Sequence, residues 1–76
     1  MKIELTPQEV ALLEAEEIPF RQNGDYTEDE ALELLERVRE AEVAYSQGTD
    51  EATEKRYRQY SELGNRLFEK IGRAHV

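Results

Sequence analysis

Hydrophobic residues recur at three- and four-residue steps along most of this 76-residue chain, a spacing typical of amphipathic helices. The pattern predicts helices at about 7–17, 28–47 and 50–71, followed by a frayed tail at 73–76. Only two to four residues separate the second and third helices, so these two should fold back on each other. We therefore expect one all-α domain: an antiparallel helical hairpin of two long helices, with a short N-terminal helix packed across it as a three-helix unit.

Side chains at the expected helix ends support these boundaries. Thr6 with Glu9, and Thr27 with Glu30, have the spacing of a capping box, in which each side chain accepts a hydrogen bond from the other residue's backbone N–H. The residue before a proline avoids helical backbone, so Pro19 should stop the first helix near residue 17. Gly48 is expected to end the second helix in a left-handed conformation. Asp50 or Thr49 would then cap the third helix.

Each expected helix has one apolar face. On the first helix it comprises Val10 and Leu13, with Leu12 beside them. On the second it comprises Ala31, Leu34, Leu35, Val38, Ala41 and Tyr45. On the third it comprises Ala52, the alkyl stem of Arg56, Tyr60, Leu63, Leu67 and Ile71, with Tyr57, Gly64 and Phe68 at the margin.

The connection between the first two helices is expected to turn at Asn23-Gly24, because both residues tolerate positive φ. It also contains Ile18, Phe20 and Tyr26, and this much apolar surface indicates a segment packed against the helices rather than a flexible linker. Alternating apolar positions at 1–5 permit a very short strand. Its candidate partner in the sequence is the segment 18–22.

Composition excludes several classes of protein. Apolar residues make up 38% of the chain and charged residues 37%, and no apolar run approaches the roughly 18 residues of a membrane span. No secretory leader is recognisable at the N-terminus, and the chain has no cysteine, so disulfides and sulfur-ligated zinc are absent. We expect a cytoplasmic protein that does not bind membranes.

The charge is concentrated in the first half of the chain. Residues 1–46 carry thirteen acids against four bases, whereas residues 47–76 carry five against six, giving the overall net charge of −8. Such a field repels nucleic acid and attracts basic surfaces, so direct nucleic-acid binding is not expected. One alternative function follows: an acidic decoy that imitates nucleic acid and occupies a basic protein, with one continuous stripe formed by Glu14, Glu17, Glu33, Glu36 and Glu40.

Catalytic chemistry has little support in the sequence. Neither Ser46 nor Ser61 has a histidine base within expected reach, since the single histidine, His75, belongs to the expected tail. No Glu-x-x-His pair of the kind used by di-iron bundles is present. We predict that the protein is not an enzyme, has no catalytic or metal-binding residues and requires no cofactor.

The segment 19–30 resembles the calcium loop of an EF-hand when Gly24 is set at the sharp-turn position. Asn23 then falls at the fifth loop position and Glu30 at the twelfth, where the family places its bidentate ligand. However, Pro19 and Arg21 stand at the first and third ligand positions. The resemblance, limited to twelve residues, implies a degenerate EF-hand-like helix–loop–helix as a further alternative.

The leading hypothesis is a small acidic protein-interaction module that contacts another protein or a second copy of itself. It rests on large apolar residues that fall off the three core faces or at their edges, and that could form an exposed patch. These residues are Leu12, Leu32, Val43 and Phe68. A homodimer is one specific form of this hypothesis, favoured by the near-neutral third helix beside an acidic second one.

Overall fold

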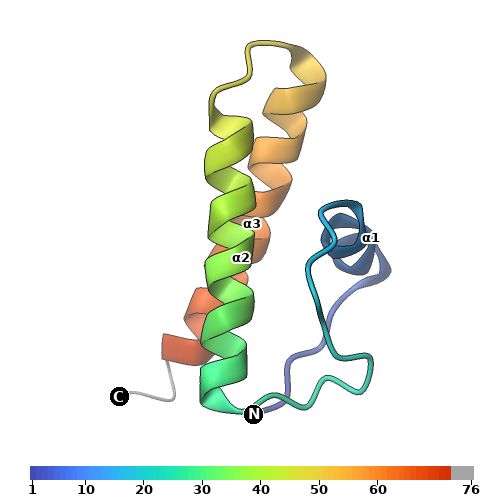
Figure 1. The fold of residues 1–76 in the computed structure, drawn as a ribbon, viewed down its shortest axis with the longest axis vertical. Helices are drawn as coiled ribbons and strands as arrows, with labels where there is room; N and C mark the ends of the chain where they lie inside the picture. The colour runs from blue at the N-terminus through green and yellow to red at the C-terminus, as the bar shows by residue number, and fades with distance from the viewer. Residues whose placement is uncertain (73–76) are drawn as a thin grey trace.

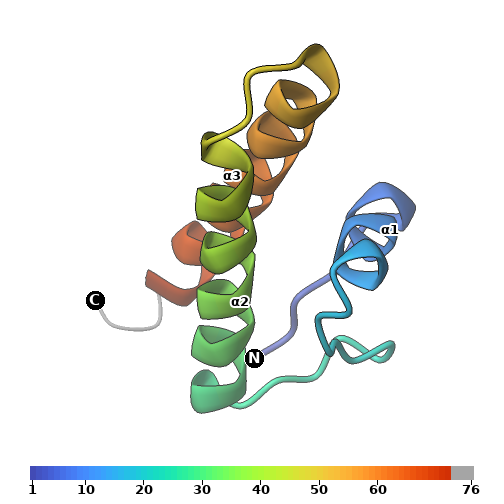
Figure 2. The same ribbon diagram turned by 45° about the horizontal axis from the view of Figure 1, so that its top comes forward.

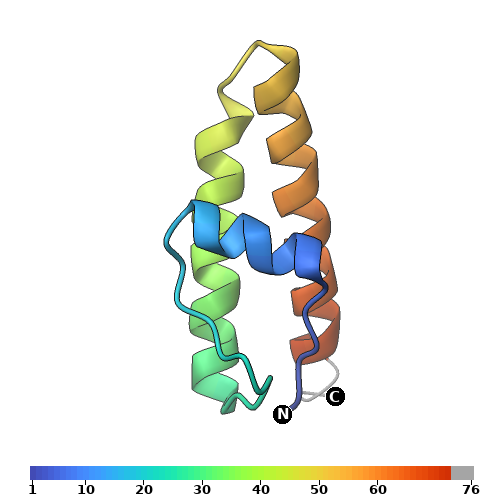
Figure 3. The ribbon, with the colours of Figure 1, turned by 90° about the vertical axis from the view of Figure 1, so that its right-hand side faces the viewer.

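The computed structural model describes residues 1–72 and contains three helices: α1 (Pro7–Ala15), α2 (Glu28–Ser46) and α3 (Glu51–Gly72). Helices α2 and α3 run antiparallel as a long hairpin, and α1 crosses one face of it near the middle (Figures 1 and 3). The predicted all-α hairpin with a short crossing helix is therefore confirmed. The tail predicted at 73–76 lies outside the described residues.

The core lies where α1 crosses the hairpin and continues toward the N-terminal end of α2. Val38, Tyr60 and Leu67 are completely buried in the hairpin seam, and Leu13 of α1 is equally buried against it. Four of the six apolar positions predicted on α2 and four of the six on α3 are buried, namely Ala31, Leu34, Val38, Ala41, Tyr60, Leu63, Leu67 and Ile71. The expectation for the start of the α3 face is wrong, because Ala52 and Arg56 are exposed beyond the part of the hairpin that α1 covers.

Helix α1 ends at Ala15, two residues earlier than expected, in a Schellman motif. The N–H of Ile18 donates to the carbonyl of Leu13 at 2.9 Å, and the N–H of Glu17 donates to the carbonyl of Glu14 at 3.1 Å. Glu17 adopts the left-handed conformation with φ 55°, a position usually occupied by glycine. The motif brings Ile18 and Leu13 together in the core.

The capping predictions for the helix starts hold, but the one for Gly48 does not. Both capping boxes form, and Asp50 accepts a 2.7 Å hydrogen bond from the N–H of Thr53 at the start of α3. Gly48 directly follows the C-cap Gln47, the expected C′ position, but its φ is not positive, so it is not left-handed. The methyl group of Thr53 lies 1.9 Å from where a Cβ would stand on Gly48, so close packing is what this position requires.

The N-terminal segment pairs with 24–26, not with 18–22 as predicted. The N–H of Ile3 donates to the carbonyl of Gly24 at 2.8 Å, and the N–H of Tyr26 donates to the carbonyl of Met1 at 2.9 Å. The segment 18–22 is unsuited to this role because Pro19 has no N–H to donate. Figure 2 shows the paired segments below α1, beside the N-terminal end of α2.

Candidate functional site

The hairpin has two unlike faces. Within residues 1–72, helix α1 and the connection pack against one of them, the covered face, and no other element of this part of the chain lies on the opposite face (Figures 1 and 3). Residues that line grooves with α1 or the connection, such as Arg37 and Ala44 of α2 and Gln59 of α3, therefore mark the covered face. The candidate interaction residues are best described by the face on which they lie.

We define the back face as the side of the hairpin opposite α1, formed by Leu32, Arg39 and Val43 of α2 and by Tyr57, Gly64 and Phe68 of α3. These residues are spaced four, seven or eleven apart on each helix, which places them on one side of it. Arg39 reaches across to α3, where its Nη2 donates to Oδ1 of Asn65 at 3.1 Å. This contact shows that the two helix sides adjoin.

Three of the four predicted patch residues are exposed on the back face. Leu32 is 40% exposed, Val43 60% and Phe68 61%, and Tyr57 adds a further half-exposed ring. The fourth prediction, Leu12, is wrong because this side chain is only 5% exposed. Leu12 lies on the side of α1 that packs against the hairpin, so it belongs to the core and to the covered face rather than to the back face.

Gly64 sits at the centre of the back face beneath the side chain of Arg39. A Cβ on Gly64 would stand 2.8 Å from Nη1 of Arg39, so glycine leaves the room in which the guanidinium lies across α3. Nη1 of Arg39 also bonds to Oε1 of Glu42 at 3.0 Å. A paired cation thus lies between the exposed apolar groups of the back face.

On the covered face, a ring stack joins all three helices. Tyr45 and Tyr60 are stacked with centroids 5.5 Å apart, and their hydroxyls both point to α1: Tyr60 donates to the carbonyl of Leu12 and Tyr45 to the carboxylate of Glu16. Burial raises the pKa of Tyr60 to about 12. The hydrogen bond to Glu16 raises the pKa of Tyr45 above its usual range. These tyrosines position α1 on the hairpin.

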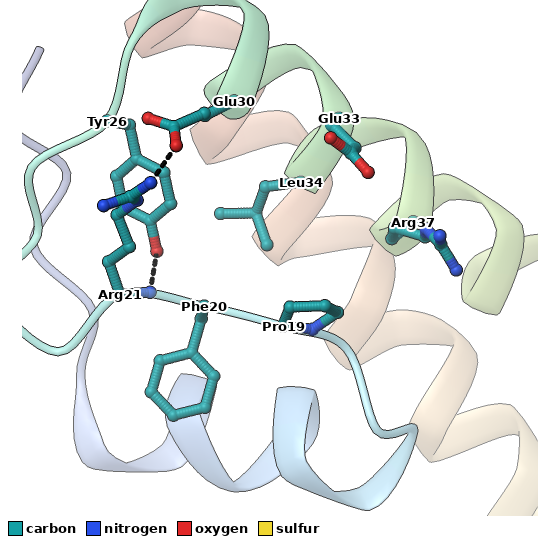
Figure 4. A pocket seen from close by; sticks show the side chains of 8 residues that line it. All are labelled: Pro19, Phe20, Arg21, Tyr26, Glu30, Glu33, Leu34 and Arg37. Carbon is teal, nitrogen blue, oxygen red and sulfur yellow. Dashed lines mark hydrogen bonds and ion pairs between the residues drawn. The ribbon is translucent and has the colours of Figure 1, made fainter.

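A hollow of about 290 Å³ lies between the connection and α2, with Pro19, Arg21, Glu30 and Leu34 among the residues that line it (Figure 4). The guanidinium of Arg21 pairs with Glu30. The backbone N–H of Arg21 donates to the hydroxyl of Tyr26 at 2.8 Å. The Glu30 carboxylate also accepts a hydrogen bond from the backbone N–H of Thr27. This bond, and to a smaller extent the pairing with Arg21, lowers the pKa of Glu30. The glutamate at the twelfth position of the EF-hand-like loop thus caps α2.

The acidic residues of the decoy alternative do not form an unbroken stripe, because a cation lies among them. Glu33 lines the hollow beside the connection and Glu40 lines another hollow near the C-terminal end of α1. Arg37 lies between them and lines both. Glu14 lines a third hollow, which lies between α1 and the N-terminal segment of the chain. This arrangement gives the decoy hypothesis no observation in its favour.

Within residues 1–72, no group of three acidic or histidine side chains is arranged to hold a metal ion. None of the three described helices is long and apolar enough to cross a membrane. The Arg39 side chain lying across Gly64 is the feature of the back face that sequence reasoning missed. Gly64 in the middle of a helix was its signal, but the sequence does not show that the group beside it is Arg39. Comparisons with protein-family models, curated proteins and solved structures find no match for this chain.

Proposed function

We propose that this protein is a small protein-interaction module that binds its partner through the back face of the hairpin. The observation that carries the proposal is the set of exposed apolar side chains, Leu32, Val43 and Phe68, on the face of the hairpin that no other element of residues 1–72 covers. Exposed apolar side chains that share one face favour association with another protein surface. Catalysis, a cofactor and direct contact with nucleic acid form no part of this function.

The specific form that we propose is a homodimer in which two back faces meet around a two-fold axis. Such an interface is self-complementary, since each copy supplies the same apolar groups around Gly64 and Arg39. The resulting four-helix layer would bury Leu32, Val43 and Phe68 of both copies. We place this module in the cytoplasm as part of the proposal, because small secreted domains commonly depend on disulfides and this chain has no cysteine.

Sedimentation velocity over a series of protein concentrations tests this form of the proposal. We expect the wild-type protein to sediment as a dimer at high concentration, and Val43→Glu and Phe68→Glu to sediment as monomers with unchanged helical circular dichroism. Ala44→Glu is the matched control, since it adds the same charge one residue along α2 but on the covered face. This variant should dimerise like the wild type.

A wild-type protein that stays monomeric at about 1 mM would remove the homodimer, since dimers weaker than this have little free energy of association. The interaction role itself is then tested by co-purification from the native host, with the wild type and Phe68→Glu compared by quantitative mass spectrometry. A protein recovered equally with both would show that the back face is not the binding surface.

A further inference from the structure

A second docking site lies on the covered face, in the angle between α1 and the first half of α3. Helix α1 crosses the hairpin near its middle, and the half nearer the bend carries no other element (Figure 3). A groove of about 370 Å³ opens there, lined by Gln8, Ala11 and Leu12 of α1 and by Ala52, Lys55, Arg56 and Gln59 of α3. This groove shares no residue with the back face.

The groove has an apolar floor and two amide side chains at its edges. Ala11 and Ala52 are small and exposed, so they leave space between the helices for an aliphatic side chain of a ligand. Leu12 forms the base of the groove and is held in place by the hydrogen bond from Tyr60 to its carbonyl. The amides of Gln8 and Gln59 can donate and accept hydrogen bonds, as a peptide backbone requires.

The charge of this groove is opposite to that of the protein as a whole. Its ionisable lining residues are Lys55 and Arg56, whereas each of the three hollows described above contains at least one glutamate. Arg56 lies near the stacked rings of Tyr45 and Tyr60. A cationic groove in a chain of net charge −8 attracts carboxylates locally.

We infer that this groove binds an acidic, amphipathic segment of a partner protein, with a leucine-sized side chain on the alanine floor and carboxylates at Lys55 and Arg56. A peptide fits better than nucleic acid, because the floor is apolar and short while the surrounding acidic surface repels an extended chain of phosphates. This site goes beyond the proposed function of the back face. The protein would then hold two partners on opposite sides of one hairpin.

The probe is a synthetic helical peptide of glutamate and leucine, with a second version in which glutamine replaces every glutamate. Titration into ¹⁵N-labelled protein should shift the amide signals of Gln8, Ala11, Ala52, Lys55 and Gln59, and fluorescence anisotropy should give a dissociation constant that rises with salt. Lys55→Glu should weaken binding about fivefold or more, because it replaces an attraction by a repulsion. Ala52→Tyr should also block binding by filling the floor while keeping both cations.

Arg58→Glu is the matched control, since it makes the same charge change on an exposed side chain of α3 that lies outside the groove. It should alter the dissociation constant by less than about twofold at physiological salt. The inference is overturned if the acidic peptide gives no groove shifts at about 1 mM, or if the glutamine peptide binds equally well. It is also overturned if Arg58→Glu weakens binding as much as Lys55→Glu, or if a single-stranded oligonucleotide binds the same residues more tightly.

Discussion

The hydroxyl of Tyr60 in α3 donates a 2.6 Å hydrogen bond to the carbonyl of Leu12 in α1, across 48 positions of the sequence. Leu12 is close to the C-terminal end of α1, and Tyr60 is completely buried in the hairpin seam. This bond therefore fixes the short helix to the long ones at the centre of the core. The position of α1 in turn defines the groove at Lys55 and Arg56.

Replacing this tyrosine should destabilise the fold. Tyr60→Phe keeps the ring but leaves the carbonyl of Leu12 without its partner in the interior, which costs about 1–2 kcal/mol. Urea unfolding followed by circular dichroism measures the loss. Tyr57→Phe is the control, because this ring is half-exposed on the back face, and its free energy of unfolding should change by less than about 0.5 kcal/mol. Equal effects of the two changes would contradict the role assigned to Tyr60.

The same tyrosine makes stability depend on alkaline pH. Its pKa is raised from 10.0 to about 12 in the folded protein, mainly by burial. The unfolded chain therefore loses this proton at lower pH than the folded protein does, so the free energy of unfolding falls as pH rises from 10 to about 12. The contribution is fully present below pH 10. Urea unfolding across this range should show a shallower decline for Tyr60→Phe than for the wild type, and parallel declines would contradict it.

Glycine at position 17 should stabilise the protein. Glu17 has a φ of 55°, and a residue with a side chain in this conformation costs about 1–2 kcal/mol, which glycine avoids. Glu17→Gly is therefore expected to raise the free energy of unfolding by about 1 kcal/mol in thermal or urea unfolding. Glu17→Ala is the control for charge, since it removes the carboxylate but keeps the strain. If the free energy of unfolding rose equally in both variants, the cause would be the loss of the Glu17 charge at the helix end and not the relief of backbone strain.

Alanine should have opposite effects at Gly64 and Gly24. At Gly64 the new Cβ meets the end of the flexible Arg39 side chain, which can move, so the better helix propensity of alanine should add up to about 1 kcal/mol. At Gly24 the backbone has φ 74° and the Cβ would stand 2.8 Å from the carbonyl oxygen of Ile3, so Gly24→Ala should cost more than about 1 kcal/mol. Urea unfolding of the two variants measures both changes. A loss at Gly64 would mean that Arg39 is held rigidly.

The sequence was sufficient to predict the elements whose causes are local. Capping boxes at Thr6 and Thr27 and the short gap before α3 act within a few residues, and they led to correct helix starts and to the hairpin. The predictions that failed depend on distant neighbours. Leu12 was predicted to lie at the edge of the core because its burial depends on Tyr60, which is distant in the sequence. The segment 18–22 was predicted to pair with residues 1–5 because the sequence does not show that Ile3 bonds to Gly24 instead.

The candidate surfaces were predictable to different degrees. Leu32, Val43 and Phe68 stood out because helical spacing alone excludes them from the core faces, and this reasoning works for exposed positions on long helices. The groove at Lys55 and Arg56 was not predicted, since it exists only where α1 crosses α3.

The crossing of α1 over the hairpin also sets the order in which the molecule opens. Contacts within the hairpin can form stepwise outward from a bend of a few residues, whereas those of α1 and the pairing of residues 1–3 must each close a loop of more than twenty residues at once. The N-terminal arm is therefore the less protected cooperative unit. Amide hydrogens of Ile3 and Tyr26 should exchange with solvent before those of Val38 and Leu67. If residues 1–26 detached from the hairpin, α2 and α3 would stay paired. The groove between α1 and α3 would then be lost while the back face remained, so the two surfaces can be lost separately.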